Sequence, residues 1–198
     1  MGIPLVVAEP TGMYRRDLRR FTYGSIGSKT ICPGRDQGLY PQGHDATVVL
    51  GFVTEAEAER VHGDNWPRDD SRWPSHCATC DYRFADEDGW QRNDNRLYRR
   101  PDGFEFAHWG SMKAVPPGTM WRVPWADKQH SVHHPQHVES WCVVLPDGST
   151  WITSQDASGG GYWTVNGTPP AIDVSPSIWH SRPDGWHGWI RNGELVDA

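Results

Sequence analysis

Hydrophobic residues in this chain come in short runs that polar and turn-forming residues separate. Residues 48–53 are apolar and β-branched, which predicts a buried strand. Thr54 and Glu57 follow at the spacing of a capping box, so we expect one short helix over residues 55–62, ended by Gly63. Residues 1–30 show no regular pattern and are expected to be irregular.

Three later stretches share a strand–turn–strand pattern, with turns at residues 101–103, 146–149 and 192–193. Their Asp-Gly and Asn-Gly pairs supply the positive φ that tight hairpins need. Residues 111–140 are rich in Pro and His and are expected to form an irregular connection or lid.

These patterns predict an α+β fold that is mostly β. We expect a zinc-ribbon-like N-terminal lobe with one short helix, residues 1–110, packed on a C-terminal antiparallel sheet of hairpins, residues 111–198. The two lobes could also form one continuous domain.

Composition narrows the class of protein. The 198 residues include 12 Trp, while hydrophobic residues make up only 36%, so aromatic bulk replaces much of the usual aliphatic packing. The net charge of −6 argues against nucleic-acid binding through overall charge. No apolar run approaches the ~18 residues of a membrane span. We therefore expect a protein kept in a cytoplasm and not secreted, with reduced thiols.

Cys77 and Cys80 form a Cys-x-x-Cys pair, a common way to present two thiolates to one tetrahedral Zn²⁺. Cys32 and His44 would complete a closed structural site with three Cys and one His. His76 is the substitute for His44, but a residue adjacent to Cys77 rarely reaches the same ion. A redox pair and plain buried thiols are the alternatives.

A family resemblance rests on the order of several motifs along residues 30–198. These motifs are RWPSHCATCDYRF (72–84), VPPGTMW (115–121), GTPP (167–170) and WHGWIRNG (186–193). The order resembles uncharacterised proteins encoded by actinobacterial phages and related bacterial elements. The resemblance implies a phage gene product with a zinc-ribbon-like Cys pair, and it implies no reaction. Members of that family carry a Cys and a His pair where this chain has SGGGYW at 158–163.

Two histidine groups are the candidates for catalysis. His130, His133, His134 and His137 stand close enough in sequence to bind a transition metal. His187 could act as a base oriented by Asp184 or Asp173. Because sequence signatures of known enzymes are missing, we expect a protein that is not an enzyme.

The Trp residues suggest a binding surface, and Trp121, Trp125 and Trp163 lie near turns and prolines, where they would be exposed. We expect a phage-encoded, zinc-stabilised structural or interaction protein, such as a minor virion component, that binds a capsid or tail protein. It would reside in the host cytoplasm or the virion. Two alternatives are a metal-dependent hydrolase using residues 130–137 or His187, and a carbohydrate-binding accessory protein with Trp platforms.

Overall fold

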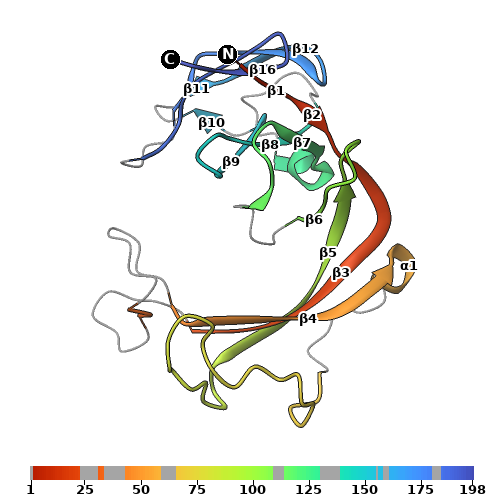
Figure 1. Ribbon diagram of the computed structural model, residues 1–198, viewed down its shortest axis with the longest axis vertical. Helices are drawn as coiled ribbons and strands as arrows, with labels where there is room; N and C mark the ends of the chain where they lie inside the picture. Colours follow the sequence, from red (N-terminus) through yellow and green to blue (C-terminus); the bar gives the residue numbers. More distant parts are fainter. Residues whose placement is uncertain are drawn as a thin grey trace. The chain divides into compact units, whose positions relative to one another are not determined.

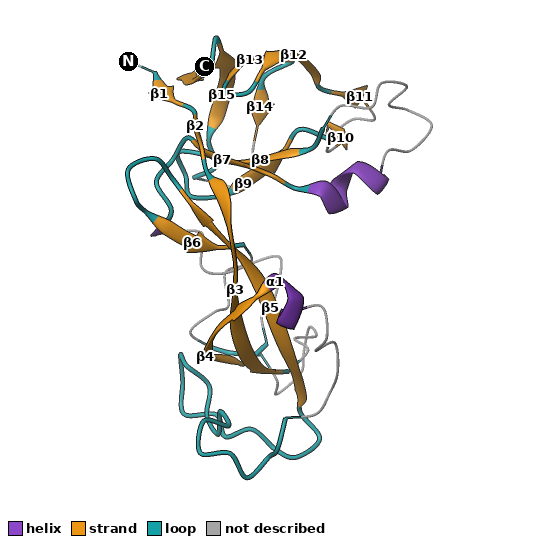
Figure 2. Cartoon of the chain, turned by 90° about the vertical axis from the view of Figure 1, so that its right-hand side faces the viewer, coloured by secondary structure: helices purple, strands orange, loops and turns teal. Residues whose placement is uncertain are grey.

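The computed structural model describes residues 2–22, 31–33, 43–58, 66–108, 114–129, 139–154, 156–157, 161–179 and 184–198. Strands dominate this part of the chain, and helical structure is short (Figure 2). The α-helix α1 covers Glu55–Ala58 and a 3₁₀ helix, η2, covers Pro124–Gln129. The mostly β fold with one short α-helix is thus confirmed, although residues 59–62 of the predicted helix lie outside the described residues.

The chain divides into two compact units, and one of them is discontinuous. Unit 1 contains Met1–Thr11 and Tyr98–Ala198, and unit 2 contains Gly12–Leu97. The division differs from the predicted boundary near residue 110. The physical reason is strand pairing, because the first strands of the chain pair with strands close to its C-terminal end and in its middle.

Unit 2 is built on long antiparallel strands. β3 (Glu9–Phe21) pairs with β4 (Asp45–Thr54), and the sheet order is β4-β3-β5-β6, with β5 at Gly89–Arg99 and β6 at Glu105–Ala107. The expectation that residues 1–30 are irregular is therefore wrong for the described part. The strand predicted at 48–53 is present, but it is not buried as expected. β4 is an edge strand and leaves Val49 and Phe52 exposed.

The described residues of unit 1 form two four-stranded sheets and two short ladders. The orders of the sheets are β1-β16-β15-β14 and β2-β7-β8-β9, and among the described strands of these two sheets only β2 and β7 pair in parallel. Besides β6, the strands within unit 1 are β1 (Ile3–Pro4), β2 (Val6–Val7), β7 (Thr119–Arg122), β8 (Trp141–Val144), β9 (Thr150–Ile152), β10 (Asp156–Ala157), β11 (Gly161–Tyr162), β12 (Thr164–Thr168), β13 (Ala171–Ser175), β14 (Ile178–Trp179), β15 (His187–Arg191) and β16 (Glu194–Asp197). Figure 1 shows β1 beside β16, so the two ends of the described chain meet in one sheet.

The three predicted hairpins are present as β5–β6, β8–β9 and β15–β16. Asn192 and Gly193 join the last pair with φ values of 47° and 76°. Two successive positive φ angles define the tight turn whose twist matches that of the flanking strands. Part of 111–140, expected to be irregular, instead forms β7 and η2.

The hydrophobic core of unit 1 takes side chains from both of its four-stranded sheets. Met120, Val143, Ile172, Val174 and Ile190 are fully or almost fully buried in one cluster. A second cluster surrounds the wholly buried Trp121. Unit 1 therefore has the aliphatic and aromatic core that stabilises an ordinary domain of this size.

Candidate metal centre

Residues 75–84 form a small hairpin that presents the Cys-x-x-Cys pair at its tip. The N–H of Phe84 donates to the carbonyl of Ser75 and the N–H of Cys77 donates to the carbonyl of Tyr82, both at 2.9 Å. Inside the turn, the N–H of Thr79 points at the Sγ of Cys77 from 3.4 Å. The backbone thus folds both thiols of the pair toward one side.

Cys32 and His44 reach the same place from a second pair of segments. Ile31 and Gly43 form an antiparallel bridge that sets Cys32 beside His44. The N–H of His44 donates to Oγ1 of Thr22, and its carbonyl accepts from the N–H of Thr22, both at 2.9 Å. Because these bonds fix the backbone of His44, its ring enters the site in a defined orientation.

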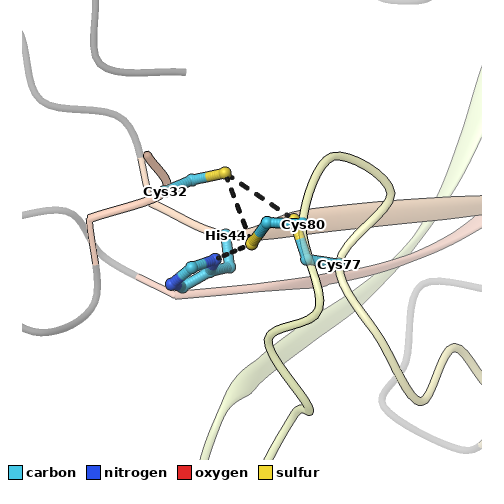
Figure 3. A group of neighbouring side chains, drawn as sticks. All are labelled: Cys32, His44, Cys77 and Cys80. Atoms are coloured by element: carbon cyan, nitrogen blue, oxygen red, sulfur yellow. Dashed lines mark hydrogen bonds between the residues drawn. The ribbon is translucent and has the colours of Figure 1, made fainter. Parts of the chain in front are cut away.

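The four side chains predicted as ligands converge, as Figure 3 shows. The Sγ atom of Cys32 lies 3.9 Å from that of Cys77 and 3.8 Å from that of Cys80. Nδ1 of His44 lies 3.3 Å from the Sγ of Cys80. All four ligand atoms are within 4.8 Å of one another. These sulfur separations are far too long for a disulfide, and none of the chain's four cysteines is in one.

The separations match a tetrahedral zinc site. With Zn–S bonds of about 2.3 Å and a Zn–N bond of about 2.05 Å, tetrahedral angles place two sulfurs about 3.8 Å apart and a sulfur and a nitrogen about 3.6 Å apart. The three separations given above, 3.9, 3.8 and 3.3 Å, agree with these values to within a few tenths of an ångström. The donor set also fits, because soft thiolates with imidazole select Zn²⁺ over hard cations. Three Cys and one His fill all four positions and leave none for a catalytic water.

The site is buried and its electrostatics favour a thiolate. Cys32 and His44 are 0% and 3% exposed, and Cys77 is 8% exposed. Burial by itself raises the pKa of the Cys77 thiol. Hydrogen bonds from the backbone of Asp45 and Thr79 and from the His44 ring outweigh burial and lower that pKa to about 6, against 9.0 for an ordinary thiol. The thiolate is the form that binds a metal.

An aromatic residue holds the histidine ligand in place. The ring of Tyr82 stacks on that of His44 with centroids 3.8 Å apart and an interplanar angle of 6°. The hydroxyl of Tyr82 donates to Asp88 at 3.1 Å, and Asp88 also accepts from the N–H of Ala85 at 2.7 Å. The stacking of Tyr82 on His44 was not predicted from the sequence, although Tyr82 stands only two residues after Cys80.

The remaining Cys and the substitute His are not in the site. His76 is exposed, and its Nδ1 is 2.9 Å from the Oγ of Ser75, so His44 and not His76 accompanies the three thiols. Cys142 belongs to the core of unit 1, where burial raises its pKa to about 12. It therefore behaves as a packing residue.

The two predicted histidine sites fare differently. His130, His133, His134 and His137 lie outside the described residues. His187 is exposed on β15, and its Nε2 lies 3.2 Å from the Oγ of Ser177. Asp173, one of its two predicted carboxylate partners, instead accepts a hydrogen bond from the N–H of Asn192 at 3.0 Å.

The predicted Trp surface requires a correction. Trp121 is 0% exposed, because its strand β7 lies between β2 and β8 and its ring packs on Phe106 and Tyr98. Trp163 is half-buried, with its ring against Trp151, and only Trp125 of the three is exposed. The most exposed Trp in the described part of the chain is Trp179, which the sequence analysis did not single out.

Comparisons of the chain with protein-family models, with curated proteins and with solved structures find no match. In the part of the chain that is described, no helix combines the length and the apolar character needed to cross a membrane. The geometry of this chain's own residues therefore carries the functional interpretation.

Proposed function

We propose that Cys32, His44, Cys77 and Cys80 hold one structural Zn²⁺ and that the chain is a zinc-stabilised structural or interaction protein. The observation that carries this proposal is the convergence of four soft ligand atoms within 4.8 Å, although Cys32 and Cys77 are 45 residues apart in sequence. A closed set of four protein ligands supports a structural and not a catalytic role for the ion.

The packing around the site supports a metal that contributes to folding. The buried cluster there consists of Cys32, Ala46, Cys77 and Phe84, with Cys80 and Tyr82 packed against it. Two of its four buried members are ligands, so little apolar area remains to hold the segments together without an ion. Metal binding in such a site supplies folding free energy directly.

The wider role proposed for the chain is that of a phage protein, such as a minor virion component that contacts a capsid or tail protein. The motif order from residue 72 to residue 193 supports this proposal through its resemblance to actinobacterial-phage proteins. Mass spectrometry of purified virions tests the role. Repeated absence of the chain from virions that are otherwise complete would reject it.

Elemental analysis of the purified chain tests the zinc site. We expect one zinc per chain, and a Co²⁺-substituted sample with the visible bands of tetrahedral thiolate coordination. Cys80→Ser should lose the metal and Cys77→Ser should in addition lose soluble expression, because Cys77 is the more buried ligand.

Cys142→Ala is the matched control, since it removes a buried thiol of unit 1 and leaves the site intact. It should keep one zinc per chain even if its melting temperature falls. A wild-type chain that is folded without any metal, or a Cys80→Ser chain that retains full zinc content, would contradict the proposal.

A further inference from the structure

The sheet β1-β16-β15-β14 has one face toward the core of unit 1 and one face away from it. Along β15, Gly188 and Ile190 are buried, while His187, Trp189 and Arg191 occupy the alternate positions. Side chains two residues apart on a strand point to the same side. The outer face of this sheet therefore carries His187, Trp189 and Arg191 in a line.

Pairing with the neighbouring strands extends the line into a row of rings. Trp179 on β14 stands directly opposite His187, and the two ring centroids are 6.4 Å apart. The rings of His187 and Trp189 have centroids 6.1 Å apart. Trp179 is 61% exposed, so its indole offers a wide flat surface to solvent. We call these three residues the Trp179 row.

Hydrogen-bonding groups accompany the row. The Oγ of Ser177 lies 3.2 Å from Nε2 of His187, which places a hydroxyl and an imidazole beside the Trp179 ring. At the other end the guanidinium carbon of Arg191 lies 5.9 Å from the centroid of the Trp189 ring. Glu194 stands opposite Arg191 on β16, so the end of the row carries one positive and one negative group. Because these two charges balance, this end of the row has no excess positive charge that would favour an anionic ligand.

The size of the apolar surface decides between a protein and a smaller ligand. A Trp side chain spans at most ~250 Å², so Trp179, which is 61% exposed, offers roughly 150 Å². Trp189 and Val196, which stands opposite it and is 36% exposed, each add less apolar surface than Trp179. A stable protein interface buries about 800 Å² on each partner around a packed apolar centre. The row is too small and too interrupted by polar groups for that purpose.

A sugar ring matches this arrangement better. A pyranose has one face of C–H groups, which packs on an indole, and a rim of hydroxyls, which needs neutral donors and acceptors such as imidazole and serine hydroxyl. We propose that the Trp179 row binds pyranose rings of a neutral glycan, with Trp179 as the stacking platform and His187 and Ser177 as hydrogen-bonding groups. This role goes beyond the zinc-stabilised function, and it lies in unit 1 and not in the unit that holds the metal centre.

Affinity electrophoresis of the full chain tests the proposal. Native gels would contain, one at a time, soluble β-1,3-glucan, galactomannan, arabinogalactan and dextran. We expect at least one of them to retard the wild-type chain. Trp179→Ala should weaken that retardation at least tenfold, and Trp179→Phe should retain part of it because a smaller ring remains. His187→Ala should also weaken binding, because the rim hydroxyls lose a partner.

Trp125→Ala is the matched control, because Trp125 is 38% exposed in unit 1 but lies on η2, outside the row. It should bind like the wild type, and all variants should keep one zinc per chain, which separates this test from that of the metal site. Three results would overturn the proposal. They are no retardation by any of the four polysaccharides, equal binding by Trp179→Ala and wild type, and conversion of a wild-type dimer to a monomer by Trp179→Ala, which would make the row a self-association surface.

Discussion

Lowering the pH from 7 to 5 should destabilise unit 1 through the imidazole of His108. Nδ1 of His108 accepts a hydrogen bond from the indole N–H of the buried Trp121 at 3.1 Å, so the neutral ring carries its proton on Nε2. The ring also lies against Trp125, with centroids 6.1 Å apart. Burial in these aromatic surroundings lowers the pKa of His108 from 6.5 to about 4.

The sign and size of the effect follow from that difference in pKa. Below pH 6.5 the unfolded chain takes up a proton at this ring, while the folded chain does not until the pH nears 4. The unfolded state therefore binds more protons, and stability falls as the pH falls. Each pH unit in this window changes the free energy of unfolding by about 1.4 kcal/mol. At pH 5 the loss attributable to His108 is about 2 kcal/mol, and above pH 6.5 the contribution is fully present.

Urea unfolding at pH 7 and pH 5, followed by circular dichroism, measures the loss when wild type is compared with His108→Asn. Asn keeps an acceptor near the position of Nδ1 but does not titrate. Protonation elsewhere, including at the thiols of unit 2, contributes equally to both chains and cancels in the difference. The wild type should therefore lose about 2 kcal/mol more than the variant between the two pH values. Equal losses in the two chains would show that His108 is not held neutral by burial.

Two further predictions concern other contacts. Gly43→Ala should destabilise unit 2 and weaken zinc retention, because a Cβ at Gly43 would lie 1.9 Å from the carbonyl oxygen of Thr22, and overpacking of this kind costs about 1–3 kcal/mol. Competition for the metal with a chromophoric chelator measures the change, and unchanged retention would contradict it. Asp127→Asn should lower the free energy of unfolding by about 1–2 kcal/mol. Asp127 accepts from Arg122 and from the N–H of Ser140, and the Arg122 guanidinium holds its pKa at about 2. Urea titration at pH 7 checks this, and a variant as stable as wild type would refute it.

The four residues of the Cys/His cluster were predictable because the chemistry that singles them out is local. The Cys-x-x-Cys spacing sets two sulfurs on one turn whatever the surrounding fold, and Cys32 was one of only two further cysteines. His44 could be preferred over His76 because neighbouring residues seldom reach the same ion. The support that Tyr82 gives to His44 could not be predicted, since ring stacking depends on how two distant segments meet.

Exposure of the Trp residues was harder to predict, because distant strand pairing decides it. Trp121 follows a Pro-Pro-Gly turn that suggested an exposed loop. In the structure its strand lies between β2, from the start of the chain, and β8. Trp179 instead sits on β14, which ends its sheet, and its side chain alternates away from the buried Ile178.

Strand β3 shows a similar effect of distant partners. Residues 1–30 showed no regular pattern and were expected to be irregular, yet residues 9–21 form this strand, with four arginines along it. Arg16 in fact forms an ion pair with Asp94 of β5 at 2.8 Å, and Arg19 pairs with Asp45 of β4. Arg20 is buried with its guanidinium over the rings of Trp73 and Phe84. Local patterns cannot reveal a strand whose charges find their partners far along the chain.

The pairing of β1 with β16 has a consequence for the order of events during translation. The ribosome makes β1 before the other described strands, and almost the entire described chain must be polymerised before Leu195 can pair with Ile3. Unit 2 is uninterrupted from Gly12 to Leu97, so it can fold while the rest is still being synthesised. During this time the nascent β1 lacks its partner strand. If unit 2 has already folded, the flexible chain that must close between β1 and β16 is shorter, so its closure costs less entropy.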